Sequence, residues 1–289
     1  MSNPASQNQE SIFLKLVALL SSVRWKNVLF TALAQYIAFL FAFNTKENIW
    51  HSLGEVKVHL IIISTALVLA AGYIINNFYD AERDLVNRPD RTRFQNIVSR
   101  GFKLNLYFFL NTLALAIALF ASWRIFIFFL VFAFALWFYS HKLSKLVLIR
   151  ELSAGFLSVM AFFSLVLYFK MINLDFFLYG TSLFFLLFAR EIHKDIIGVK
   201  GDVVFGYESI TTSVGLIPSK RIFQVVLLSS IAVDAAFLWL NSKPEFYLIL
   251  GAIAVLKIFL LLLIDRNTKP MHRIVQLVLL LYIIGVVWL

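Results

Sequence analysis

The chain has 289 residues, of which 61% are hydrophobic and only 15% are charged, and its mean hydropathy is +0.85. Soluble domains carry about 25% charged residues and about half apolar ones, so this composition excludes an ordinary water-soluble domain. The net charge of +10 does not indicate a nucleic-acid partner, because most basic residues lie between long apolar runs. The absence of cysteine excludes disulfides, thiol catalysis and cysteine-ligated metals.

The apolar runs predict an all-α, polytopic membrane protein of about nine transmembrane helices, which form a single domain over residues 1–289. Residues 1–10 are polar, and we expect them to be a solvated tail. Residues 11–23 have the pattern of an amphipathic segment that lies in the membrane interface. The predicted spans are 28–43, 58–76, 104–121, 125–139, 152–169, 175–190, 222–240, 245–264 and 274–289.

The basic residues indicate the orientation of these spans. Twenty lysine and arginine residues lie in the N-terminal segment and the even-numbered loops, whereas five lie in the odd-numbered loops. The positive-inside rule then places the N-terminus and the even-numbered loops in the cytoplasm, in an inner membrane of bacterial or archaeal type. Two of these cytoplasmic segments, 77–103 and 191–221, are predicted as the longest loops, and they hold half of the 16 acidic residues.

The first acidic segment follows the second predicted span. Asn76, Asp80 and Asp84 are spaced at i, i+4 and i+8, so they point in one direction if the span continues as a helix. Two carboxylates on one stripe repel each other unless a cation lies between them. Mg²⁺ takes one or two carboxylates together with water and phosphate oxygens, so this spacing suits a metal-diphosphate site. A solvated, merely charged loop would explain any single aspartate better than it explains the whole set.

The second acidic segment follows the sixth predicted span. Glu191, Asp195 and Asp202 lie at i, i+4 and i+11, which is again one face of a continuing helix. Interleaved basic side chains would neutralise phosphate charge directly, and these are Arg190, Lys194 and Lys200.

These two segments resemble the motifs of the UbiA superfamily of intramembrane prenyltransferases. Residues 76–84 resemble its NDxxDxxxD motif, and residues 195–202 resemble its second aspartate-rich motif. The resemblance covers essentially the whole chain in the right order, and residues 190–202 are most similar to the geranylgeranylglycerol-phosphate geranylgeranyltransferase branch. Further similar segments are Arg24 with Asn27, residues 87–91 and residues 139–143.

Two positions depart from the family pattern. Asn77 stands where the first motif usually has an aspartate, and Gly198 stands where the ether-lipid branch often has an acid. Each exchange removes one charge that would face a metal. The residues expected to be catalytic, and to bridge one or two Mg²⁺ ions to a diphosphate, are Asp80, Asp84, Asp195 and Asp202.

The resemblance implies a reaction between two substrates. Mg²⁺ and basic residues would draw off the diphosphate of an allylic, geranylgeranyl-class donor, and a small acceptor would attack the carbocation-like prenyl group that remains. The best match for the acceptor is a lipid precursor of the geranylgeranylglycerol phosphate type, and membrane lipids would surround the apolar spans. The expected substrate-binding residues are Asn27, Asn76, Asn77, Arg88, Arg91, Tyr139, Lys142, Glu191 and Lys194.

Three alternatives stay open. An aromatic quinone precursor with a carboxylate would need the same basic pocket as a phosphate acceptor. A transporter would place its charged residues near the bilayer midplane rather than at span ends. A relative that binds prenyl lipid without turning it over would explain Asn77 and Gly198. Lys257 and Asp234 lie inside predicted spans, where they would form a structural pair outside the site.

Overall fold

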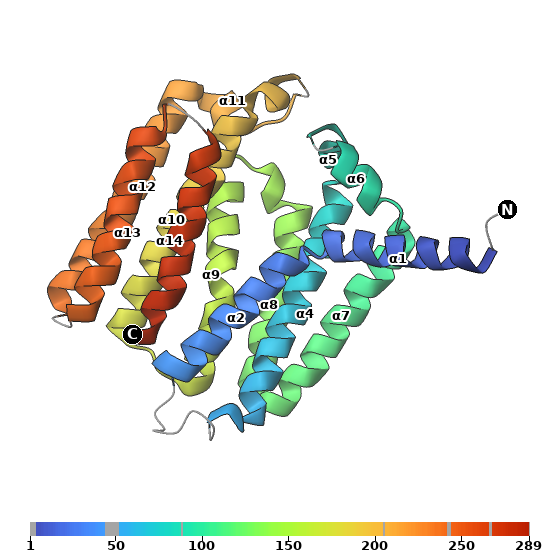
Figure 1. Cartoon of the computed structure of the whole chain (residues 1–289), viewed down its shortest axis with the longest axis horizontal. Helices are drawn as coiled ribbons and strands as arrows, with labels where there is room; N and C mark the ends of the chain where they lie inside the picture. Colours follow the sequence, from blue (N-terminus) through green and yellow to red (C-terminus); the bar gives the residue numbers. More distant parts are fainter. Residues whose placement is uncertain are drawn as a thin grey trace. The chain divides into compact units, whose positions relative to one another are not determined.

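A computed structural model describes residues 4–43, 52–87, 89–204, 206–241, 244–265 and 268–288. Within these ranges the chain is helical and contains no strand, which confirms the predicted all-α class (Figure 1). The chain divides into two compact units. Unit 1 comprises Met1–Leu33 and Lys57–Lys142, and unit 2 comprises Ala34–Val56 and Leu143–Leu289.

Each predicted span corresponds to a helix. Seven described segments are long and apolar enough to cross a membrane, and α10 and α14 are not among them, so the total of nine spans stays a prediction. The helices are α2 (Trp25–Ile37, extended by a π-helical turn at Ala38–Ala42), α4 (Val56–Tyr79), α7 (Arg100–Ala121), α8 (Trp123–His141), α9 (Ile149–Phe169), α10 (Leu174–Val204), α12 (Leu216–Leu240), α13 (Pro244–Leu263) and α14 (Thr268–Gly285).

The two segments that we predicted as long loops are largely helical. After α4, the chain forms the short helices α5 (Ala81–Asn87) and α6 (Pro89–Gln95). α10 is 31 residues long and continues well past its apolar part, and α11 (Ile210–Val214) precedes α12. Regular helix therefore carries both acidic segments beyond the apolar runs, which fixes the directions of their side chains.

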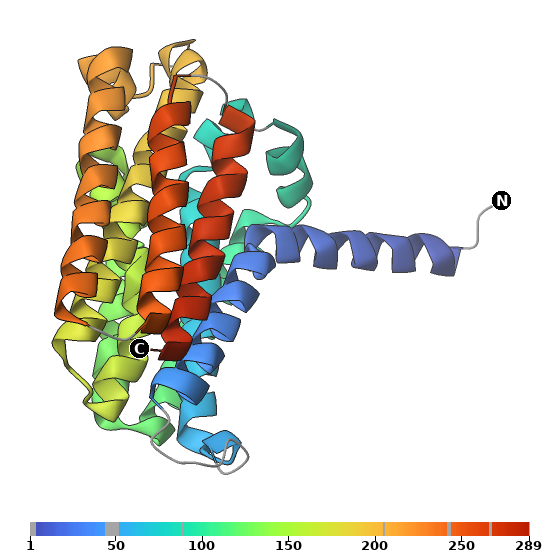
Figure 2. The same cartoon turned by 60° about the vertical axis from the view of Figure 1, so that its left-hand side comes forward.

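In unit 1, helix α1 (Pro4–Ser22) runs across the direction of α4 and α7 (Figure 2). It begins inside the predicted tail and includes most of the predicted amphipathic segment. Phe13 and Leu16 are 66% and 55% exposed, as expected of an apolar face that rests on lipid. The chain turns into α2 at Arg24, whose φ is 50°. Gln95 of α6 donates to the main-chain oxygen of Ser21 at 3.0 Å, which ties α1 to the first acidic segment.

In unit 2, α10, α12, α13 and α14 pack around a buried polar network. Lys257 is fully buried and forms an ion pair with Asp234, which confirms the expected structural pair. The Lys257 Nζ also donates to Ser230 Oγ and Tyr282 Oη, each at 2.7 Å. Ser182 Oγ donates to Asp234 Oδ1 at 2.5 Å. One charge pair thus joins four helices.

Candidate functional site

The first acidic segment of unit 1 begins at the end of α4, bends at Asp80 and continues into α5. The main-chain N–H of Asp80 donates to Asn76 at 2.9 Å, and that of Asp84 donates to Asp80 at 2.8 Å, so helical hydrogen bonds lie on both sides of this bend. The side-chain amide of Asn76 donates to Asp80 Oδ2 at 2.7 Å. Both aspartates are half-buried. Asn76 and Asp80 are therefore in contact one turn apart, as their spacing predicts, and Asp84 follows on α5 after the bend.

Asn77 has a different environment from its neighbours on this stripe. Its side chain is buried, and its Nδ2 donates to Gln95 Oε1 at 2.9 Å. Its Oδ1 accepts from the Nζ of Lys103, a lysine that is only 2% exposed, also at 2.9 Å. In this structure Asn77 therefore holds α6 and α7 against α4. An aspartate there would form an ion pair with Lys103, whereas the amide leaves that ammonium charge uncompensated by this contact.

A polar cavity in unit 1 lies beside Asn77. The guanidinium of Arg24 lies 5.1 Å from the centroid of the Tyr73 ring, and Asn27 donates to the Tyr73 hydroxyl at 3.4 Å. The cavity lies where the turn between α1 and α2 meets α5 and α6. The predicted site residues Asn77, Asp84 and Arg91 line it. It is lined by Ser22, Arg24, Tyr73, Asn77, Asp84, Arg91, Thr92 and Gln95.

The remaining predicted residues of unit 1 lie at the end of α8. Tyr139 is half-buried and Lys142 is exposed. The ring of His141 lies 5.3 Å from that of Tyr79 at the end of α4, so this end of α8 adjoins the first acidic segment. Arg88 lies outside the described residues.

In unit 2, Glu191 is paired with its own helix neighbours. Its carboxylate accepts from Arg190 at 2.9 Å and from Lys194 at 2.6 Å. Burial alone would raise the pKa of Glu191, but Lys194 and Arg190 outweigh it and lower that pKa to about 2. Glu191 is therefore ionised at neutral pH, and it orients Lys194, whose side chain is half exposed. His193 is buried, and its ring packs 5.8 Å from that of Phe223.

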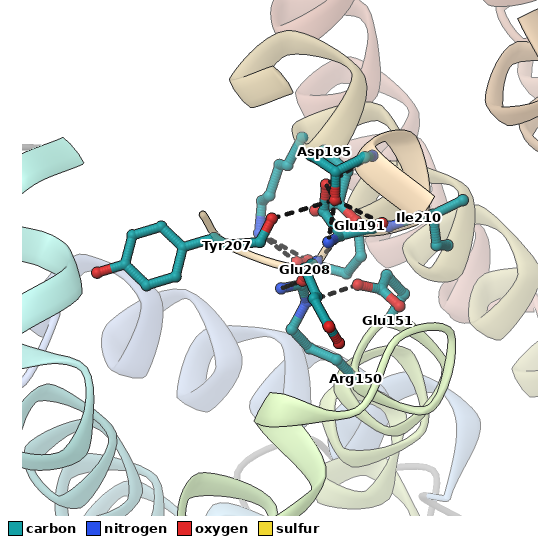
Figure 3. A network of polar contacts seen from close by, with 10 residues as sticks. Arg150, Glu151, Glu191, Asp195, Tyr207, Glu208 and Ile210 are labelled. Atoms are coloured by element: carbon teal, nitrogen blue, oxygen red, sulfur yellow. Dashed lines mark hydrogen bonds and ion pairs between the residues drawn. The ribbon is translucent and has the colours of Figure 1, made fainter. Parts of the chain in front are cut away.

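Asp195 is the centre of a second network in unit 2 (Figure 3). It is 8% exposed, and its Oδ2 accepts from Arg150 Nη2 at 2.7 Å and from the main-chain N–H of Ile210 at 3.3 Å. Arg150 Nε also donates to Glu151 Oε1 at 2.5 Å. Burial raises the pKa of the Asp195 carboxyl to about 7, with Arg150 opposing and Glu151 adding to the rise.

The sequence did not identify Arg150 and Glu151 as site residues. They precede the fifth predicted span, far in sequence from either acidic segment, and only their position as paired charges at the start of an apolar run could have drawn attention to them. Burial of Glu151 at 1% exposure is a property of the packed structure.

The last predicted carboxylate, Asp202, lies two turns after Asp195 on α10 and is 5% exposed. A Cβ atom added at Gly198 would lie 3.8 Å from Asp202 Oδ2 and would meet no closer atom. An acidic side chain at position 198 would therefore lie next to the Asp202 carboxylate. The space around Gly198 would accommodate a larger side chain, so packing does not require glycine there.

No three acidic, histidine or cysteine side chains among the described residues are grouped closely enough to hold a metal ion. The available donors nevertheless suit a hard cation, because they are carboxylate oxygens. One of them, the buried Glu151 Oε2, has no hydrogen-bond partner. The carboxylates that fit Mg²⁺ in chemistry are Asp80 and Asp84 in unit 1 and Asp195 and Asp202 in unit 2.

Comparison with known proteins identifies relatives over most of the chain. Residues 18–284 match the model of the UbiA prenyltransferase family. The digeranylgeranylglyceryl phosphate synthase of Sulfurisphaera tokodaii is 29% identical over 210 residues, which cover 71% of this chain and 73% of that protein. The synthase of the same name from Saccharolobus solfataricus is 26% identical over 258 residues, which cover 88% and 89%.

Solved structures share the fold. One that concerns digeranylgeranylglyceryl phosphate synthase in membranes superposes with a TM-score of 0.73 at 21% identity and covers 95% of this chain and 99% of the other. A UbiA homologue from Archaeoglobus fulgidus, bound to GPP and Mg²⁺, superposes with a TM-score of 0.69 at 15% identity and covers 94% and 100%. The same homologue has also been solved bound to Cd²⁺, with a TM-score of 0.65.

Proposed function

Because the chain belongs to the UbiA prenyltransferase family and is an integral membrane prenyltransferase, we propose that it transfers a geranylgeranyl-class group from its diphosphate to a lipid acceptor of the geranylgeranylglycerol phosphate type. The observation that carries this proposal is that helix continues past both apolar runs, from α4 into α5 and along α10, and that carboxylates lie on these continuations. The names of the relatives favour this acceptor class.

The proposed reaction exchanges one C–O bond for another. The bond between C1 of the allylic group and the diphosphate breaks, and its electron pair leaves with the diphosphate. A hydroxyl oxygen of the acceptor bonds to C1 and loses its proton to the solvent. Apolar spans would exclude water from the cationic carbon, so that the acceptor rather than water captures it.

The chain's own residues would bind and orient the two phosphate-bearing substrates. We assign metal binding to Asp80 and Asp84 in unit 1 and to Asp195 and Asp202 in unit 2. Bound Mg²⁺ would neutralise the charge that develops on the departing diphosphate. Further phosphate contacts are assigned to Arg91, Lys142 and Lys194, with Tyr139, Asn27 and Asn76 beside them.

An acceptor panel tests the proposal. Membranes that contain the protein are incubated with labelled geranylgeranyl diphosphate, Mg²⁺, and either geranylgeranylglyceryl phosphate or an aromatic quinone precursor with a carboxylate. We expect an ether-linked product with the glycerol phosphate lipid. Product with the aromatic compound alone would contradict the acceptor class. Binding of the diphosphate without product from any acceptor would contradict the proposed enzymatic reaction.

A pair of variants tests the metal assignment in unit 1. Asp80→Ala should lower turnover about 100-fold, as expected when a group that acts on developing charge is removed. Glu82→Ala removes an exposed carboxylate two residues away and should leave turnover close to that of the wild type. Equal turnover in both variants would show that Asp80 does not act in the reaction.

A further inference from the structure

Glu151 is a buried carboxylate with one unused oxygen. Its side chain is 1% exposed, and its Oε1 accepts from Arg150 Nε at 2.5 Å. Its Oε2 is buried and has no hydrogen-bond partner among the described residues. Buried carboxylate oxygens are normally paired, because an unpaired one loses its hydration without compensation. This oxygen can therefore accept a further hydrogen bond.

Arg150 divides one edge of its guanidinium between two carboxylates. Nε and Nη2 lie on the same edge of the planar group, and this edge fits both oxygens of a single carboxylate. Here Nε contacts Glu151, while Nη2 contacts Asp195 Oδ2 at 2.7 Å. The third contact, from Nη1 to the main-chain oxygen of Glu208, is long at 3.4 Å. Arg150 therefore makes a two-donor contact with neither carboxylate (Figure 3).

We propose that Glu151 is a positioning residue that receives Arg150 when Asp195 takes up a divalent cation. In this exchange Nη2 leaves Asp195 Oδ2 and bonds to the unused Glu151 Oε2, so that Arg150 and Glu151 form a two-bond pair. Arg150 is then the cation that pairs with Asp195 until a metal ion takes its place. The inference rests on the proposed function, because it takes Asp195 to be a metal ligand.

The charges of the cluster favour such an exchange. Two buried carboxylates contact one guanidinium, and a divalent cation on Asp195 would supply the positive charge that Arg150 otherwise provides. If Arg150 had no other carboxylate to pair with, it would compete with the metal for Asp195. Glu151 removes that competition by holding Arg150 after the exchange. The residue that would hold Arg150 after the exchange is thus Glu151 on α9, which lies outside the aspartate-rich motif on α10.

A double-variant cycle tests the exchange by metal binding rather than by turnover. The full-length protein is placed in lipid nanodiscs with inorganic diphosphate, and Mn²⁺ binding is measured by electron paramagnetic resonance. Glu151→Gln keeps an acceptor for Arg150 Nε but replaces the second oxygen by a donor, so Arg150 should stay on Asp195. We expect Mn²⁺ affinity to fall about tenfold, as for other changes next to a metal ligand.

Removal of Arg150, which competes with the metal ion for Asp195, should restore Mn²⁺ binding. Arg150→Gln, alone or combined with Glu151→Gln, should bind Mn²⁺ at least as tightly as the wild type. A double variant as weak as Glu151→Gln would overturn the inference, because Glu151 would then act without Arg150. If Arg150→Gln does not accumulate, Arg150→Lys serves instead, since it lacks the two-donor edge. In the Arg150→Lys protein, Glu151→Gln should cause no further loss of Mn²⁺ affinity. A further loss would also overturn the inference.

Two controls separate this inference from the proposed function. Glu208→Gln removes a nearby exposed carboxylate whose side chain does not contact Arg150, and it should bind Mn²⁺ like the wild type. A tenfold loss in Glu208→Gln would overturn the inference, since the effect would then be one of general charge. Asp195→Asn should weaken the diphosphate-dependent Mn²⁺ binding by more than Glu151→Gln does. Unchanged binding in Asp195→Asn would contradict the metal assignment itself, whatever the cycle shows.

Discussion

Unit 2 contains two buried clusters built on similar ion pairs, and they differ in how completely their polar atoms are paired. In the first, Lys257 and Asp234 are surrounded by Ser182, Ser230 and Tyr282, and both carboxylate oxygens accept hydrogen bonds. In the second, Arg150 contacts two carboxylates at once, and one oxygen of Glu151 has no hydrogen-bond partner in the part of the chain that the structure describes.

The difference indicates what each cluster is for. A fully paired network holds helices together and offers nothing to a ligand, whereas an incompletely paired one retains capacity for a further cation. Loss of a charge from the first cluster should therefore destabilise the protein without altering metal binding. Loss of a carboxylate charge from the second cluster should weaken metal binding and change the stability little.

The largest effect is expected for Lys257→Met. This variant leaves Asp234 buried without its cation, which should cost about 3–5 kcal/mol of unfolding free energy. The measurement is unfolding in mixed micelles followed by circular dichroism, with Mn²⁺ binding measured on the folded fraction. The double variant Lys257→Met/Asp234→Leu removes both charges and should recover most of the loss. A stable single variant with weakened Mn²⁺ binding would reverse the assignment of the two clusters.

Asp195→Asn should show the opposite pattern. Prenyl transfer should fall about 100-fold, because the carboxylate proposed to act on the diphosphate is lost. The unfolding midpoint should change little, since Arg150 keeps its contact with Glu151 and with the main chain of Glu208. Rate and midpoint are measured on the same preparation. A large drop in the midpoint with normal transfer would make Asp195 a structural residue.

The fold was largely predictable because its signals are local. Every predicted span corresponds to a helix, since about 20 apolar residues in a row have few alternatives in lipid. The helical continuation at residues 191–204 was not predicted as such, because its polar composition resembles that of a loop. Only the i, i+4 spacing of Glu191 and Asp195 indicated it.

The site was predictable where its residues share one helix and not where they come from several. The contact between Asn76 and Asp80 follows from their i, i+4 spacing alone. The contact of Asn77 with Lys103 depends on how α7 packs against α4, and Arg150 reaches Asp195 from α9. Sequence spacing within one helix carries no information about either of these contacts.

Lys103→Met extends the comparison to unit 1. Lys103 is buried like Lys257, but its contact is the neutral amide of Asn77. Its loss leaves an unpaired amide oxygen and at the same time removes a buried charge, so the two effects largely offset each other. We expect a change of no more than about 1 kcal/mol in unfolding free energy. A loss as large as that of Lys257→Met would show that Lys103 has an anionic partner.

The smallest effect is expected for Gly198→Ala on α10. Glycine inside a helix costs about 0.5–1 kcal/mol relative to alanine, and a Cβ here meets only Asp202 Oδ2, at an ordinary 3.8 Å. The variant should therefore raise the unfolding midpoint slightly and leave Mn²⁺ binding unchanged. Gly198→Glu would place a third carboxylate beside Asp202, and it should tighten Mn²⁺ binding. If Gly198→Ala weakened metal binding, close approach to the glycine backbone, and not the missing acid, would explain why this chain has glycine there.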